Sequence, residues 1–192
     1  MMRIASKFTR LLMSLWWKRT LASFGSGSSI DRPAWIAGGI QIAIGSNVRI
    51  WRDARLETMN PRPQTIRLSI GNDTVIQPGV HIGAIDSVKI GQGVLIASDV
   101  YITDHDHDWM NPEEPVISNK RAITAPVEIQ DHVWLGQRVM VLKGVTIGAG
   151  SIIGAGSIVT NDIPPRSIAL GSPAKVVRTF DSQTKQWSRK AA

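Results

Sequence analysis

The chain has 192 residues, no cysteine and a formal net charge of +7. This length suits one principal domain with a sizeable core, and the lack of cysteine excludes disulfide bonds, a thiolate nucleophile and cysteine-ligated metal sites. Residues 1–30 carry five basic and no acidic residues, and residues 172–192 carry five basic residues and one acid, so these ends hold +5 and +4 and residues 31–171 sum to −2. Charged ends of this kind attract phosphate-rich ligands or anionic lipid, but no recognition motif accompanies the charge, so we expect no nucleic-acid partner.

The N-terminal stretch has apolar residues at helical spacing: Ile4, Phe8, Leu11, Leu12 and Leu15. This pattern predicts an amphipathic helix, which with its following link occupies residues 1–29. One interpretation is that the helix caps the open end of the main domain. The other is that residues 3–19, with their basic side chains and Trp16–Trp17, rest on a membrane surface, since the apolar run is too short to span a bilayer.

Gly25–Ser29 predicts a flexible link, after which we expect an irregular first coil from Ile30. From Ile44 onward, aliphatic residues recur every six positions: Ile44, Ile50, Leu56, Ile70, Ile76, Ile82, Ile90, Ile96, Ile102, Ile129, Leu135, Val141, Ile147, Ile153 and Val159. A period of six is neither the 3.6 of a helix nor the strict alternation of a simple strand. It is typical of a parallel β-helix, in which each hexad supplies one short strand and one turn and three hexads complete a coil.

The hexad is interrupted at three places. Met59–Thr65, with two prolines, predicts a loop, and a two-residue slip falls near Ala84–Asp86. The longest interruption predicts an extruded loop at about 104–126, which carries His105 and His107 near its start. Because a long excursion from a regular solenoid is usually functional, this loop is the first place to look for chemistry.

After Val159 the hexad ends at Pro164–Pro165, where two prolines stop strand addition. We therefore expect the β-helix to occupy residues 30–165 and a basic C-terminal tail to occupy residues 166–192. The tail contains the run Gly171–Arg178, with two of its cations.

Four motifs in this order resemble those of the hexapeptide-repeat acetyltransferases, of the galactoside, maltose, nodulation-factor and O-antigen types: the histidine-bearing loop, Asp131–Gly136, Gly154–Pro165 and Gly171–Arg178. The resemblance covers residues 70–178. It implies an all-β fold, a left-handed parallel β-helix with an N-terminal helix, an extruded loop and a C-terminal tail. It also implies acetyl-CoA as acetyl donor and a homotrimer with active sites between subunits.

In that family a histidine removes the proton of the acceptor hydroxyl as it attacks the thioester. The resemblance places this role on His105, and spacing alone leaves His107 as the alternative. Without the family, a histidine flanked by Asp104 and Asp106 is more often a solvated loop residue. The same carboxylates can also fix the imidazole tautomer and raise its basicity.

The resemblance further implies a set of substrate-binding residues, Gln77, His107 and Trp134. Gln77 stands where relatives often carry an asparagine, which leaves the acceptor open. The implied coenzyme A groove is formed by Trp134, Gly136, Gln137, Ala155, Thr160, Lys175 and Arg178. Its glycine-rich turns would admit a long ligand to the backbone, and its cations would pair with phosphates.

Three alternatives remain at this stage. An N-acetyltransferase acting on an amino sugar uses the same residues. A γ-carbonic-anhydrase-like enzyme would bind zinc through His81, His105, His107 and His132, although their spacing does not follow that family's pattern and we expect no metal. A non-catalytic scaffold leaves the histidine loop unexplained. We expect an O-acetyltransferase for a sugar of a surface polysaccharide or lipopolysaccharide, located in the cytoplasm or at the inner membrane face.

Overall fold

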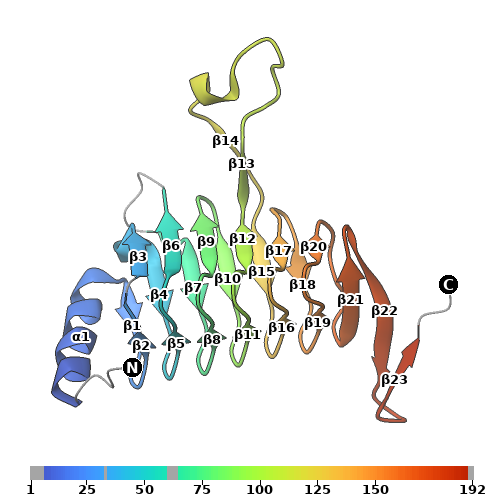
Figure 1. Cartoon of the computed structure of the whole chain (residues 1–192), viewed down its shortest axis with the longest axis horizontal. Helices are drawn as coiled ribbons and strands as arrows, with labels where there is room; N and C mark the ends of the chain where they lie inside the picture. Colours follow the sequence, from blue (N-terminus) through green and yellow to red (C-terminus); the bar gives the residue numbers. More distant parts are fainter. Residues whose placement is uncertain (1–6, 33, 60–64, 190–192) are drawn as a thin grey trace.

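The computed structural model describes residues 7–32, 34–59 and 65–189. The chain winds into a three-sided parallel β-helix, with α1 (Lys7–Thr20) at its N-terminal end and a hairpin projecting from its side (Figure 1). Each full coil contributes one strand to each of three sheets, so strands far apart in the sequence become neighbours. This arrangement follows from the hexad, because three hexads bring the chain back beside its own previous turn.

The three sheets, called A, B and C here, have the following strands. Sheet A contains β1 (Ser23–Phe24), β4 (Ile42–Ile44), β7 (Leu68–Ile70), β10 (Val88–Ile90), β15 (Val127–Ile129) and β18 (Thr146–Ile147). Sheet B contains β2 (Ser29–Ile30), β5 (Arg49–Ile50), β8 (Val75–Ile76), β11 (Leu95–Ile96), β16 (Trp134–Leu135), β19 (Ile152–Ile153), β21 (Ser167–Gly171), β22 (Ala174–Asp181) and β23 (Gln186–Arg189). Sheet C contains β3 (Ala34–Ala37), β6 (Ala54–Thr58), β9 (His81–Ala84), β12 (Tyr101–Thr103), β17 (Met140–Val141) and β20 (Ile158–Val159).

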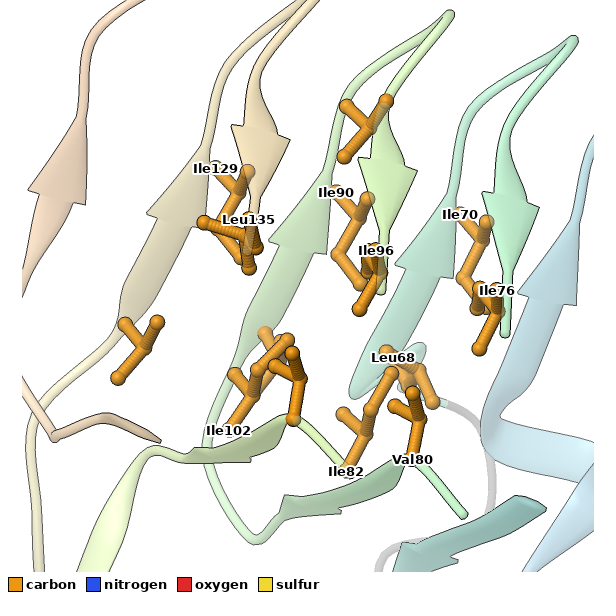
Figure 2. Close-up of a cluster of buried hydrophobic side chains, with 14 of the residues drawn as sticks. Leu68, Ile70, Ile76, Val80, Ile82, Ile90, Ile96, Ile102, Ile129 and Leu135 are labelled. Atoms are coloured by element: carbon orange, nitrogen blue, oxygen red, sulfur yellow. The ribbon is translucent and has the colours of Figure 1, made fainter. Parts of the chain in front are cut away.

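The core is a set of aliphatic columns inside the three sheets. Ile70, Ile90 and Ile129 lie in register on adjacent strands, and Ile76, Ile96 and Leu135 form the next column (Figure 2). Every aliphatic residue of the predicted hexad series is at most 3% exposed. The predicted inward positions are therefore confirmed, since only stacked coils can bury them.

Adjacent residues of β11 allow a matched test of this core. Ile96 is fully buried and its neighbour Leu95 is 40% exposed. We expect Ile96→Ala to lower the free energy of unfolding by about 2–5 kcal/mol, because it removes buried methyl groups and leaves a cavity. Leu95→Ala should change it by no more than about 0.5 kcal/mol. Urea denaturation followed by circular dichroism measures both, and equal losses would contradict the assignment of faces.

The structure corrects two expectations about where the coils begin and end. The first coil starts at Ser23 and not at Ile30, because Ser23–Phe24 pairs with β4, so Gly25–Ser29 is a turn within a coil. The expected tail forms strands: β21 pairs with β19 in parallel, and β22 and β23 add antiparallel strands to sheet B. Antiparallel strands return through tight turns and need no six-residue repeat, so the hexad gave no signal for them. The expected loop at 59–65 lies mostly outside the described residues.

The helix α1 covers the first coil. Trp17 is 4% exposed and Leu21, just after the helix, is 5% exposed, and both join the main hydrophobic core. This packing agrees with the capping interpretation of the N-terminal helix. Within the described residues, no helix has the length and apolar character needed to cross a membrane.

Candidate active site

The hairpin leaves the β-helix directly after β12. β13 (His105–His107) pairs antiparallel with β14 (Ala122–Thr124), and the chain rejoins sheet A at β15. The loop beyond the two strands contains a short 3-10 helix, η2 (Val116–Ser118). His105 therefore lies at the base of the hairpin, where it meets sheet C (Figure 1).

Asp104 anchors this base. Its side chain is fully buried, and its two carboxylate oxygens accept hydrogen bonds from the backbone N–H groups of Ile85, Asp86 and Ser87 at 2.7–3.1 Å. These N–H groups belong to the corner where the hexad slips. The buried carboxylate thus satisfies donors that a regular turn would have paired with backbone.

The same carboxylate holds the imidazole of His105. Oδ1 of Asp104 lies 2.9 Å from Nδ1 of His105, whose side chain is 16% exposed. A carboxylate only accepts, so Nδ1 carries the proton and Nε2 is left with a free lone pair. The hydroxyl of Thr103, 3.1 Å from the backbone oxygen of His105, donates to that oxygen and steadies the same turn. No hydrogen-bond partner of Nε2 is found in the part of the chain that the structure describes. This arrangement leaves Nε2 able to accept a proton.

The electrostatics favour a charged Asp104. Burial acts to raise its pKa, but the hydrogen bonds from His105 and from the three backbone N–H groups outweigh it and lower the pKa below the ordinary value. Asp104 is therefore ionised at neutral pH and stabilises a positive charge on His105 when that imidazole accepts a proton.

Gly83 makes room for the imidazole. It lies on the outer face of β9, in register with Thr103, and a Cβ placed on it would come within 3.2 Å of Cε1 of His105. Its φ is not in the left-handed region, so the glycine is needed here for space. The sequence analysis did not single out Gly83, because the six-residue pattern does not reveal its contact with His105.

We expect Gly83→Val to displace the imidazole and lower turnover about 10²-fold, since a misplacement near 1 Å has this effect on a catalytic group. Gly83→Ala, with one methyl group at the limit of contact, should lower turnover about 3- to 10-fold. Steady-state rates with each variant measure this, with melting temperature and acetyl-CoA affinity as controls for folding. A Gly83→Val variant as active as the parent would contradict the role.

The two other residues flanking the predicted base have different roles. Asp106 pairs with the ammonium group of Lys143 at 2.6 Å, which ties the hairpin to the corner after β17. His107 is exposed, and no side-chain partner of its imidazole is recorded among the described residues. Of the two aspartates considered from the sequence, only Asp104 orients a histidine.

Most of the residues predicted for coenzyme A lie on sheet B or at its corner with sheet C, whereas His105 lies at the corner between sheets C and A. Trp134, in β16 of sheet B, is 47% exposed and points outward. Gly136, Gln137 and Ala155 follow at the corner between sheets B and C, and Gln77 lies on the same corner after β8. A Cβ on Gly136 would come within 2.6 Å of the backbone N of Ala155, so the buried Gly136 lets two coils pack closely at this corner, where Gln137 and Ala155 are exposed.

The remaining predicted residues are distributed between two places. Thr160 follows β20 at the corner between sheets C and A, the corner from which the hairpin leaves, and is exposed. Lys175 and Arg178 are exposed on β22, the strand added antiparallel to β21 at the C-terminal end of sheet B. One chain therefore brings together Asp104, His105 and Gly83, and holds Trp134 and the cations elsewhere.

The histidines considered as zinc ligands do not converge. His81 lies 3.1 Å from Glu57, whereas His132 occupies a corner turn of positive φ between sheets A and B, beside Gly93. Across residues 7–32, 34–59 and 65–189, no group of three histidine, aspartate or glutamate side chains is placed to hold a metal ion. Glu57 itself was not singled out from the sequence, because its partners lie about 20 residues away and only the coil register reveals them.

Comparison with known proteins supplies the family. A model described as bacterial transferase hexapeptide (six repeats) matches residues 126–161. The chain is 40% identical over 116 residues to the putative lipopolysaccharide biosynthesis O-acetyl transferase WbbJ of Escherichia coli, covering 57% of this chain and 59% of that protein. It is 31% identical over 160 residues to the galactoside O-acetyltransferase of Escherichia coli, covering 83% of this chain and 68% of that protein.

Solved structures agree on the fold. AntD, an N-acyltransferase from Bacillus cereus in complex with dTDP and 3-hydroxybutyryl-CoA, aligns with a TM-score of 0.74 at 22% identity, covering 90% of each chain. A maltose O-acetyltransferase from Clostridium difficile aligns with a TM-score of 0.64 at 24% identity, covering 94% of this chain and 80% of that one. At these identities the likeness concerns the fold alone.

The chain spans about half of the length of several curated relatives that it matches. The galactoside enzyme is matched over more than two thirds of its length, and the hexapeptide repeats, the parallel three-sided fold and the histidine hairpin accompany that match. The chain therefore belongs to the hexapeptide-repeat acetyltransferase family.

Proposed function

We propose that this protein is an acetyl-CoA-dependent O-acetyltransferase that acts on a hydroxyl of a sugar in a surface polysaccharide or lipopolysaccharide. The observation that carries the proposal is the Asp104–His105 pair, with Nδ1 held at 2.9 Å and Nε2 free, at the base of the hairpin. The sequence relatives support a hydroxyl acceptor, since two of them are named as O-acetyltransferases of a galactoside and of lipopolysaccharide biosynthesis.

In the proposed reaction, Nε2 of His105 takes the proton of the acceptor hydroxyl as that oxygen attacks the acetyl carbonyl. Acetyl-CoA supplies an activated acetyl thioester when bound. Asp104 keeps the proton on Nδ1 and stabilises the imidazolium. The released thiol has a pKa of about 8.5, so it can leave as a thiolate without a strong acid from the protein. The proton on His105 then passes to the thiolate or to solvent.

The residues proposed to hold coenzyme A fit such a ligand. Gly136 lets two coils pack closely at the corner between sheets B and C, where Gln137 and Ala155 are exposed. Lys175 and Arg178 are exposed on β22, near the C-terminal end of sheet B, and can pair with the phosphates of coenzyme A. We assign Trp134 to the groove shared by acceptor and donor, Gln77 and His107 to acceptor contacts and Thr160 to coenzyme A, as the family resemblance implies.

We propose a left-handed winding and a homotrimer in which each site is shared by two chains. Within one chain, Trp134 lies on sheet B and His105 lies at the base of the hairpin after sheet C. In the proposed trimer, Trp134 of one chain lies near His105 of a neighbouring chain. The hairpin loop also exposes apolar side chains that a neighbour would cover, with Ile117 93% and Met110 68% exposed. Multi-angle light scattering of the purified protein tests the mass, and a monomer at micromolar concentration would contradict the shared site.

We place the enzyme in the cytoplasm, where acetyl-CoA is available. The lipopolysaccharide acceptor and the basic N-terminal residues 3–19 are compatible with contact at the inner membrane face; of these, residues 3–6 lie outside the described part. Flotation with anionic vesicles tests this contact, and failure to co-float would exclude it.

The test of function is transfer of labelled acetyl groups to a panel of sugars, nucleotide sugars and oligosaccharide repeat units. We expect a product that releases acetate in mild alkali, as an ester does. An alkali-stable product would identify an amine acceptor and replace the hydroxyl by the amino sugar alternative. Binding of acetyl-CoA without transfer to any sugar would overturn the proposal.

A further inference from the structure

A polar network covers the outer face of sheet C beside the proposed base. Glu57 of β6 lies at its centre, with a side chain that is 12% exposed. The indole N–H of Trp35 donates to Oε1 of Glu57 at 3.0 Å, and the guanidinium of Arg55 and the imidazole of His81 lie 2.8 and 3.1 Å from Oε2. Burial acts to raise the pKa of Glu57, but these partners outweigh it and lower the pKa, so the carboxylate stays charged.

The coil register connects this network to His105. Glu57, Gly83 and Thr103 are paired residues on β6, β9 and β12, and Trp35, Arg55, His81 and Tyr101 form the next row of the same face. The ring of His81 lies 5.1 Å from that of Tyr101, and Gly83 lies under the imidazole of His105. Strands β3, β6, β9 and β12 run side by side from the α1 end of the molecule to the base of the hairpin (Figure 1).

Trp35 is the distal end of this row. Its side chain is 63% exposed, yet its hydrogen bond to Glu57 fixes the ring orientation. It borders a hollow of about 600 Å³ between α1 and the first coil, which is also lined by Trp16, Trp17 and Arg32. Trp17 has a buried indole N–H for which the described residues provide no hydrogen-bond partner. A hydroxyl entering the hollow is the kind of acceptor that this N–H lacks.

We propose that the outer face of sheet C is the track along which a glycan acceptor lies, with its acetylated sugar at His105 and a more distal sugar stacked on Trp35. This inference rests on the proposed function and identifies its substrate class as an oligosaccharide or polymer. From β3 to β9 the track spans two strand spacings, roughly 10 Å. A pyranose unit lengthens a glycan by about one such spacing, so Trp35 meets about the third sugar.

The chemistry of the track matches a glycan. Sugar rings have apolar C–H faces rimmed by hydroxyl groups, so a fixed tryptophan face and a row of charged hydrogen-bonding side chains recognise both parts. An anionic membrane would not select the carboxylate of Glu57, which lies in the middle of the row. A second protein copy is a poorer occupant, because Arg55 and His81 already pair with Glu57 of the same chain and offer it no free charge.

The experiment compares malto- and galacto-oligosaccharides of one, two, three and six units as acceptors. We expect kcat/KM to rise from one to about three units and then level off, because longer chains extend past the track. Trp35→Ala should lower kcat/KM for the three- and six-unit acceptors roughly 10-fold, as loss of an aromatic contact does. It should change the value for the single sugar less than about 2-fold. Trp35→Phe keeps an aromatic ring and loses the indole N–H. Its kcat/KM for the three- and six-unit acceptors should lie between the values of the parent and of Trp35→Ala.

Trp51→Ala is the matched control, since Trp51 is 39% exposed at the corner between β5 and β6 and is not part of the row on the outer face of sheet C. It should leave the length dependence intact. Turnover that is independent of acceptor length, or a Trp35→Ala loss equal for all lengths, would overturn the track and leave the proposed function standing. Absence of transfer to every sugar would overturn the proposed function and the track with it.

Discussion

His105→Ala is expected to lower turnover by about 10²–10⁴-fold, which is the usual contribution of a positioned general base. A sugar hydroxyl is a weak nucleophile at neutral pH, so the variant loses the group that removes its proton during attack. The affinity for acetyl-CoA should be unchanged within about 2-fold, because the proposed coenzyme A contacts are made by other residues than His105. Steady-state kinetics and calorimetric titration with acetyl-CoA measure the two quantities separately.

His107→Ala is the matched control, two residues along the same strand. Its imidazole is exposed and lacks the carboxylate partner that His105 has. We expect its kcat at saturating acceptor to stay within about 3-fold of the parent, and the loss of its proposed acceptor contact to appear as a higher KM. If His107→Ala lost more activity than His105→Ala, the base would have to be reassigned to His107.

Much of the fold was predictable, because burial alone dictates the hexad. An aliphatic residue at every sixth position can be buried only if it stacks on the equivalent residues of the coils before and after it. Ile76, Ile96 and Leu135 show this, since they lie 20 and 39 positions apart and are all fully buried in one column. The extruded loop that carries His105 could be predicted as well, because it is the longest interruption of the six-residue repeat.

The N- and C-terminal parts were less predictable. Phe24 opens the first coil six residues before Ile30 and pairs with Ile44. Because the count followed aliphatic residues, this aromatic residue was not included in it. β22 and β23 are held by antiparallel pairing and by contacts such as the rings of Phe180 and Trp187 at 5.3 Å. Antiparallel pairing depends on backbone register and turn geometry, and the six-residue repeat carries no information about either.

The site was predictable in its residue types and not in its contacts. Asp104 and Asp106 looked equivalent beside His105, but one is fully buried and the other pairs with Lys143. The difference arises because the slip at Ile85–Ser87 directs three backbone N–H groups at Asp104. Glu57 and Gly83 were missed because Trp35, His81 and His105, which they contact, lie 22–24 residues away in the sequence.

Asp104→Asn is expected to have the second large effect, on both stability and turnover. The carboxylate accepts bonds from three backbone N–H groups and from Nδ1 of His105, and an amide replaces one of its acceptor oxygens by a donor. A buried donor facing another donor costs about 1–3 kcal/mol. The amide NH2 group can also donate to Nδ1 of His105 and so stabilise the tautomer that carries its proton on Nε2, and we therefore expect turnover to fall about 10²–10⁴-fold at temperatures where the variant is folded.

The pH dependence distinguishes the two effects. The folded-state pKa of Asp104 is lowered, so its ionised form contributes stability that is fully present above the unfolded pKa of about 3.9 and is lost as pH falls through the lower folded value. Asn does not titrate, so the stability difference between parent and variant should shrink below about pH 4 and be constant near neutrality. Denaturation across this range measures it, and a difference that stayed constant in acid would show that the fold does not lower the pKa of Asp104. The ¹⁵N shifts of His105 in the parent protein test the tautomer without any variant: a proton on Nε2 at neutral pH would remove the base from the mechanism, because the only nitrogen facing the hydroxyl would then be a donor.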